Sequence, residues 1–140
     1  MNKISEKTEG SNIILNNSDK LLILKRSNKV PMCGLWSAIS GRLEKYEQPL
    51  QRAKIEILEE VGLTNEQIKL LKIGQVTVVR NTKNDMCWSI YPFLFKTNTN
   101  KIKLVKFIIF VWIVPATLTK FKTVPKLYQI FISITHHHHF

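Results

Sequence analysis

Short runs of apolar residues alternate with polar turns along the first part of the chain. Residues 11–17 and 20–26 have aliphatic centres, and the polar residues Asn17, Ser18 and Asp19 lie between these centres. Because large aliphatic residues favour strands while Asn and Asp favour turns, these two runs predict a β-hairpin. The polar residues 1–9 precede them, and we expect that end of the chain to be loose.

The spacing of apolar residues changes in the middle of the chain. Apolar side chains now recur every three or four positions, at Leu50, Ala53, Ile57 and Val61. This period places them on one face of an α-helix. Pro49 suits the first turn of a helix and Gly62 suits its end, so the pattern predicts one helix between them.

The later apolar runs predict further strands. Thr64 can cap a short turn after the central helix. Residues 107–114 form the most hydrophobic run, but eight residues fall far short of the roughly 20 that a membrane helix needs, so we expect a buried strand there. The remaining predicted segments are a strand at 35–39, a turn and strand at 70–80, a polar turn at 81–85, a strand at 86–95 and a helical turn at 115–121.

The last segment, residues 124–134, closes the domain. Apolar residues at 124, 127, 131 and 134 favour an amphipathic helix, although the alternation in IFISI also fits a strand. The order of elements predicts a single α/β (α+β sandwich) domain, residues 1–134, with a mixed β-sheet packed between helices. The His-rich tail, residues 135–140, resembles a tag remnant more than a native metal site.

Charge is distributed unevenly over the 140 residues. The net charge is +11, and all ten acidic residues lie at or before Asp85, whereas the last 55 residues carry seven lysines. That positive half could attract nucleotides or RNA. It could equally only solubilise an apolar segment, since there is no Arg cluster or recognisable nucleic-acid module.

The cysteines and the first residues bear on the cellular compartment. Cys33 and Cys87 do not form a disulfide framework, and neither has a second Cys or His at zinc-ligand spacing. The N-terminal residues lack the apolar core of a signal peptide. We therefore expect a cytoplasmic protein with reduced thiols and no membrane association.

Glu56, Glu59 and Glu60 stand at i, i+3 and i+4 of the predicted helix, so their carboxylates share one side of it. Like charges at this spacing cost about 0.2–0.5 kcal/mol per pair. A hard divalent cation shared with substrate phosphates would offset that repulsion. The alternative is a solvated acidic helix face, because Glu is a common helix former.

The surrounding spacing resembles the Nudix box. That pattern is Gly, five residues, Glu, seven residues, Arg-Glu, an aliphatic residue, any residue, Glu-Glu, any residue, Gly and an aliphatic residue. Eight of its positions match over residues 41–63: Gly41, Glu47, Glu56, Ile57, Glu59, Glu60, Gly62 and Leu63. The preceding GLWSAISGRLE is also similar to the strand and loop that lead into the box in many Nudix hydrolases.

The resemblance implies a fold and an activity. It implies the Nudix fold and a pyrophosphohydrolase that cleaves a nucleoside diphosphate linked to another moiety. Glu56, Glu59 and Glu60 would be the catalytic glutamates and the ligands of Mg²⁺, or alternatively Mn²⁺. The backbone carbonyl of Gly41 or Ser40 would lie beside them. Homodimers are common in the family.

Other residues are candidates for support and for substrate binding. By resemblance, Glu47 would be an outer ligand or a support at the start of the helix. Arg26 and Arg42 are basic residues before and beside the box that could contact phosphates. Trp36 could stack on a nucleobase, although a core position is the alternative.

Three departures from the family pattern limit the transfer of function. Ile55 replaces the Arg that normally orients the acidic cluster, and Arg52, one turn before Glu56, is the candidate substitute. Tyr46 stands where the family commonly has Gly, so we expect an altered loop. No acidic residue follows Asp85, although many relatives use a late Glu as base. The alternative function is therefore a catalytically weak Nudix-fold protein that binds nucleotide or RNA.

Overall fold

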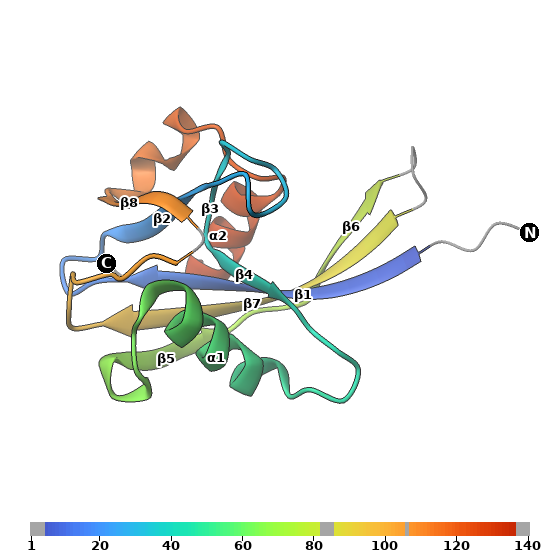
Figure 1. The fold of residues 1–140 in the computed structure, drawn as a ribbon, viewed down its shortest axis with the longest axis horizontal. Coiled ribbons are helices and arrows are strands. Elements are labelled where there is room, and N and C mark those ends of the chain that lie inside the picture. The colour runs from blue at the N-terminus through green and yellow to red at the C-terminus, as the bar shows by residue number, and fades with distance from the viewer. Residues whose placement is uncertain (1–4, 82–85, 106, 137–140) are drawn as a thin grey trace, which may run out of the picture.

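A computed structural model describes residues 5–81, 86–105 and 107–136 of the chain. Its centre is a pair of parallel strands, β1 (Ser5–Leu15) and β7 (Met86–Thr97), which pair along the whole length of β1. The other strands lie beside this pair in one mixed sheet (Figure 1). They are β2 (Leu21–Arg26), β3 (Trp36–Ser37), β4 (Ile39–Arg42), β5 (Ile68–Ile73), β6 (Thr77–Asn81) and β8 (Phe107–Ile113).

Two helices cover opposite faces of the sheet. Helix α1 (Pro49–Val61) lies on one face and helix α2 (Leu127–Thr135) lies on the other (Figure 1). Consecutive residues of β1 point to opposite sides, so Ile13 packs in the core under α2 and Ile14 in the core under α1. Strands buried on both faces give continuous aliphatic runs, which explains the sequence of β2.

The sheet divides at the strands that follow β2. Strand β3 pairs with the end of β2, and β4, which follows after Ala38, pairs instead with Glu9 to Asn12 of β1. The segment from β3 to β4 therefore crosses from one part of the sheet to the other, immediately before α1. This crossing brings residues of β1, β2 and β4 to the same region as the glutamates of α1.

Most predicted elements are confirmed. The hairpin of β1 and β2, the helix from Pro49 to Val61, the strand β7 and the closing helix α2 all form. Short 3₁₀ helices follow the central helix at Asn65–Gln67 and follow β8 at Pro115–Lys120, where helical turns were expected. Thr64 is the N-cap residue of the first of these, and its backbone N–H donates to the side-chain Oε1 of Gln67 at 2.9 Å.

Four predictions need correction. Residues Ser5 to Glu9 are not loose but belong to β1, because β7 pairs with them. The single strand at 35–39 is two strands interrupted at Ala38, and the strand at 70–80 is β5 and β6, which pair with different halves of β7. Strand β8 is only partly buried, since it lies at the edge of the sheet and Ile109 is 45% exposed.

Two predicted segments fall wholly or partly outside the described residues. Asn81, the first residue of the predicted polar turn, ends β6, and the rest of that turn lies outside them. Most of the His-rich tail also lies outside, and its first residue, Thr135, belongs to α2. Of the helices that the structure describes, none is long and apolar enough to cross a membrane.

Candidate active site

The two ends of α1 are set by local signals in the sequence. Pro49 occupies the first turn, where its missing N–H costs no helical hydrogen bond. Gly62 follows the last turn with a φ of 74°, and its N–H donates to the carbonyl of Leu58 at 3.0 Å. This left-handed position suits glycine, which has no Cβ to clash. The helix that carries the acidic residues is therefore fixed in length.

Helix α1 presents its three glutamates at different depths. The apolar side of the helix is buried against the sheet, which fixes its rotation. Glu56 and Glu60 flank that side and are each 6% exposed, whereas the side chain of Glu59 is 59% exposed. The three carboxylates thus share one side of the helix, as the spacing predicts. Glu56 and Glu60 are buried, whereas Glu59 is exposed to solvent.

Gly41 on β4 allows Glu56 to approach the sheet. A Cβ atom added at Gly41 would lie 2.1 Å from Oε1 of Glu56, well below any real contact distance. The absent side chain therefore leaves the space that the carboxylate occupies. Position 41, the first glycine of the Nudix-like pattern, therefore needs a residue without a side chain, because the strand β4 and the Glu56 side chain of α1 meet at this point.

Arg52 holds the carboxylate of Glu56. Its Nε and Nη2 both donate to Oε1 of Glu56, at 2.9 and 2.7 Å. Hydrogen bonding to Glu56 is the main cause of the raised pKa of Arg52, and the negative charges of Glu56, Glu47 and Glu59 raise this pKa further. Ile55, in the position of the usual Arg, is 43% exposed on the outer side of the helix. Arg52 thus makes the contact that Ile55 cannot make.

Glu47 supports the loop that leads into the helix. Its Oε1 accepts a hydrogen bond from the backbone N–H of Glu44 at 3.0 Å, and its Oε2 lies 3.7 Å from Nε of Arg52. One oxygen therefore fixes the loop and the other faces the arginine that holds Glu56. This arrangement fits the supporting role that the resemblance implies better than direct contact with a ligand.

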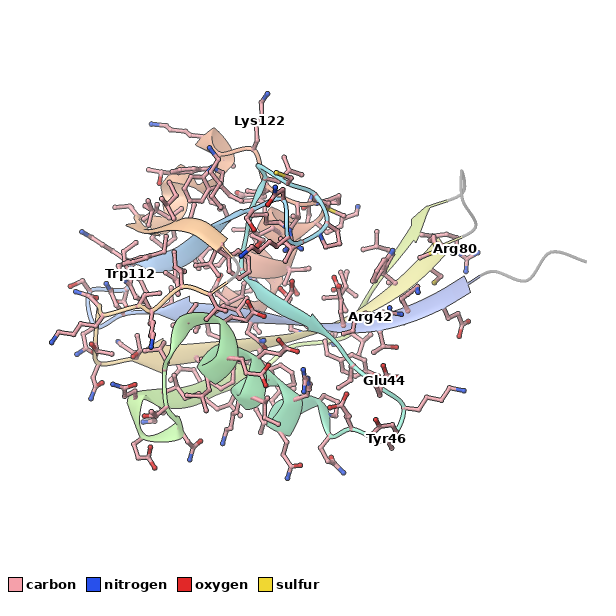
Figure 2. All side chains as sticks on the ribbon, in the orientation of Figure 1. Arg42, Glu44, Tyr46, Arg80, Trp112 and Lys122 are labelled. Carbon is pink, nitrogen blue, oxygen red and sulfur yellow. The ribbon has the colours of Figure 1, made fainter. Side chains whose placement is uncertain are left out.

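Tyr46 lies in the loop between β4 and α1. It is 87% exposed, and Figure 2 shows it at the outer turn between β4 and α1, close to Glu44. The non-glycine residues with positive φ in the described part of the chain are Asp19, Met32 and Lys126. Tyr46 therefore does not adopt the left-handed conformation that favours glycine, and the expectation that this loop differs from that of the family stays a prediction.

Arg26 and Glu9 form a second charged group, on β2 and β1. Burial lowers the pKa of Arg26, and the charges of Glu9 and Glu60 oppose that shift. Burial also raises the pKa of Glu9, against the charges of Arg26 and Arg42. The Arg26 guanidinium therefore interacts electrostatically with Glu60 of α1 and with Glu9 of β1. Nη1 of Arg26 donates to Oγ of Ser37 at 3.3 Å, and its Nε donates to the carbonyl of Pro31 at 2.6 Å.

A small cavity adjoins Glu9 on the side of the sheet that α2 covers. Its volume is about 30 Å³, which is room for about one water molecule. Polar groups line one part of it and apolar groups line the rest. The lining residues are Glu9, Ser11, Ser37, Ala38, Ser40, Ile90, Val124, Pro125, Leu127 and Ile130. The three serine hydroxyls and the Glu9 carboxyl can all make hydrogen bonds there.

The other predicted substrate-binding residues differ in their surroundings. Arg42 is exposed at the end of β4, opposite Glu9 in the strand pairing, and Figure 2 labels it near that end of the strand. Trp36 is partly buried and packs edge-on against Phe121, with the ring centroids 5.4 Å apart and the planes at 76°. It also packs against the core under α2. This packing accounts for Trp36 without a bound base.

The acidic residues fit a hard divalent cation in their chemistry. They offer carboxylate oxygens, which Mg²⁺ prefers, and Glu56 lies against the backbone of β4 at Gly41. Within the residues that the structure describes, however, no three His, Cys, Asp or Glu side chains are grouped so as to hold a metal ion. Instead, the Arg52 guanidinium lies 2.7 Å from Glu56 and 4.0 Å from Glu59 and supplies positive charge to them.

Sequence reasoning missed Glu9 and Asn12. Glu9 was placed in a loose end, so nothing connected it with Arg26. Asn12 is 1% exposed on β1 and is one of few fully buried polar residues. An Asn directly before the aliphatic run of β1 was the available signal, because the strand pattern continues through it.

A mixed sheet between two helices, with a glutamate-bearing helix set against the strand before it, defines a Nudix-type α/β sandwich. The chain belongs to the NUDIX domain family, whose profile matches residues 7–125. A comparison with curated proteins found no match.

Solved structures support the same fold. An Ap4A hydrolase of C. elegans, in a binary complex, is 18% identical with a TM-score of 0.74, over 91% of this chain and 93% of that one. The E. coli dihydroneopterin triphosphate pyrophosphohydrolase is 16% identical with a TM-score of 0.75, over 91% and 95%. The NUDIX domain of Shewanella oneidensis NrtR, complexed with ADP ribose, is 15% identical with a TM-score of 0.71, over 92% and 86%. At these identities the likeness establishes the fold alone.

Proposed function

We propose that this protein is a divalent-metal-dependent hydrolase that cleaves a phosphoric anhydride bond in a nucleoside diphosphate derivative. The observation that carries the proposal is the buried pair of carboxylates on α1, Glu56 and Glu60. Glu56 lies against Gly41 of β4 and is held by Arg52. A helix buries two carboxylates at a cost, and a role in binding a cation and phosphates gives a reason for that cost.

Each residue has a part in this proposal. Glu56, Glu59 and Glu60 would hold Mg²⁺ or Mn²⁺ together with the carbonyl of Gly41, and the cation would neutralise phosphate charge and acidify a bound water. Arg52 fixes the orientation of Glu56, with Glu47 behind it.

The basic residues and a base complete the assignment. Arg26 and Arg42 supply positive charge for the phosphates. A box glutamate, Glu56 or Glu60, serves as the base, because no acidic residue follows Asp85.

Nucleotides are the substrate class that we propose. The similar structures include an Ap4A hydrolase and a NUDIX domain complexed with ADP ribose. A nucleotide carries the phosphates that Arg26 and Arg42 suit.

A second function has its own support. The Arg52 guanidinium is bonded to Glu56, and the described residues contain no group of three side chains arranged to hold a metal. A protein that binds nucleotide or RNA through its positive charge, without turnover, fits those two observations. The excess of lysines after Asp85 favours it as well.

The test is product release from a panel of nucleoside triphosphates, dinucleoside polyphosphates and nucleotide sugars, with Mg²⁺ and with chelator. We expect turnover by the unmodified protein and loss of most of it in Glu59→Gln and Glu60→Gln. Glu66→Gln changes an exposed glutamate of the 3₁₀ helix that follows α1; it is the matched control and should retain full activity. Binding of nucleotide without turnover on any substrate would favour the second function.

A further inference from the structure

Asn12 is a buried amide with no partner in the described part of the chain. It lies in β1 between Ile39 of β4 and Phe93 of β7, on the face that α1 covers, and is 1% exposed. Neither its Oδ1 nor its Nδ2 has a hydrogen bond within the described residues. Buried polar side-chain atoms nearly always have a partner, so the amide needs one that is not a protein group.

The side chain of Asn12 lies close to Gly10, which faces Gly41 across the strand pair. A Cβ atom added at Gly10 would lie 3.8 Å from Oδ1 and 4.0 Å from Nδ2 of Asn12. Gly10 pairs directly with Gly41 between β1 and β4. The Asn12 amide therefore lies next to the paired glycines Gly10 and Gly41, which we call the glycine pair.

The carboxylate of Glu56 also lies against this glycine pair, at Gly41. The position of a Cβ at Gly41 is 2.1 Å from Oε1 of Glu56, so this carboxylate stands directly over the strand that pairs with Gly10. The amide of Asn12 and the carboxylate of Glu56 thus border one short stretch of sheet that has no side chains of its own.

We propose that Asn12 is a positioning residue of the cation site, and that its amide binds a water molecule which also contacts Glu56 or belongs to the hydration shell of the cation. The inference rests on the proposed function. Mg²⁺ keeps several of its waters in proteins, and groups that bond to such waters orient the ligands. An amide suits this task because it can donate and accept at once.

The test compares cation binding and stability in full-length variants, with Mn²⁺ measured by electron paramagnetic resonance titration. Asn12→Leu keeps the size of the side chain but removes both polar atoms. We expect it to weaken Mn²⁺ binding about tenfold or more. In the absence of metal it should melt at the same temperature as the unmodified protein or higher, because an unpaired buried amide has been removed. Asn12→Asp keeps an acceptor oxygen and should retain Mn²⁺ binding. It therefore tests the inference even if the leucine variant fails to fold.

Thr97→Val is the matched control, since Thr97 is a buried polar residue at the far end of β7. It should bind Mn²⁺ as the unmodified protein does. Unchanged Mn²⁺ affinity in Asn12→Leu, with Glu60→Gln impaired, would overturn the inference and leave the proposed function standing. Failure of the unmodified protein to bind Mn²⁺ would overturn both. A lower melting temperature of metal-free Asn12→Leu with unchanged affinity would assign Asn12 to folding alone and also overturn the inference.

Discussion

Arg52 donates two hydrogen bonds to a single oxygen of Glu56, one turn further along the same helix. The pair places a positive charge beside the buried carboxylate of Glu56, although the usual arginine position holds Ile55. Arg52 makes this charge-assisted contact at the i, i+4 spacing that brings two side chains together on one side of a helix. That it replaces the arginine of the family pattern stays a prediction.

Removal of Arg52 should impair the site more than the fold. Arg52→Ala frees the Glu56 carboxylate to rotate, so we expect cation affinity and kcat/KM to fall about tenfold, as is usual when a residue that orients a metal ligand is lost. Lys54→Ala, on the same helix, should leave both unchanged. If Arg52→Ala has normal affinity and rate, Arg52 does not replace the missing arginine.

Gly41→Ala should displace the Glu56 carboxylate. The new methyl group would occupy the space of the carboxylate, which is the end of a flexible side chain and can move away. We expect a cost to stability of about 1 kcal/mol, because the strand itself need not shift, and a loss of activity of about tenfold or more. Denaturant unfolding and product release measure the two effects.

Gly10→Ala is the control for that substitution. The nearest atoms to an added Cβ at Gly10 are 3.8 Å away, an ordinary contact distance. Its stability should therefore stay within about 0.5 kcal/mol of the unmodified protein. A Gly41→Ala protein as active as Gly10→Ala would show that the close approach of β4 and Glu56 is not needed.

Glu9 should make stability depend on pH. Burial raises its folded-state pKa above the ordinary 4.5, so the folded protein binds this proton more tightly than the unfolded chain. The resulting stability is complete below pH 4.5 and is lost as the pH rises through the folded-state pKa. Glu9→Gln removes the ionisation, so its melting temperature should rise relative to the unmodified protein from acid to neutral pH. Parallel melting curves across that range, as expected for the exposed control Glu44→Gln, would contradict this.

Trp36 should matter for packing before it matters for substrate. Trp36→Leu removes the edge contact with Phe121, and we expect a loss of about 1–3 kcal/mol in the free energy of unfolding. Phe121→Leu should show a similar loss, and the two changes together should reveal a coupling of about 0.5–1.5 kcal/mol in a double-mutant cycle. A large rise in KM in Trp36→Leu with unchanged stability would instead assign the ring to substrate binding.

Local signals explain the elements that the sequence predicts well. Pro49 and Gly62 bound α1 through backbone conformations that neighbouring residues alone determine. The apolar repeat of α2 places Leu127, Phe131 and Ile134 in the core as expected. In each case the determinant lies within one or two turns of the residue concerned.

Non-local pairing explains what the sequence does not predict. The first half of β1 is polar, and its pairing with β7, far along the chain, and with β4 at Glu9 and Gly10 makes it a strand. Glu9 could therefore not be connected with Arg26. Helical spacing placed the three glutamates on one side, but the depth of Glu56 compared with Glu59 depends on where the sheet lies under α1.

The parallel pairing of β1 with β7 also has a consequence for synthesis of the chain. Ser5 pairs with Met86, 81 residues later, so at typical translation rates of about 5–20 residues per second the β1 edge waits on the order of 10 s for its partner. Helix α1 can begin to form in that interval, because its contacts are local. The half of the charged region that contains Glu9 is assembled only after β7 emerges from the ribosome. Until then a nascent chain exposes an unpaired strand edge, the type of surface that chaperones protect.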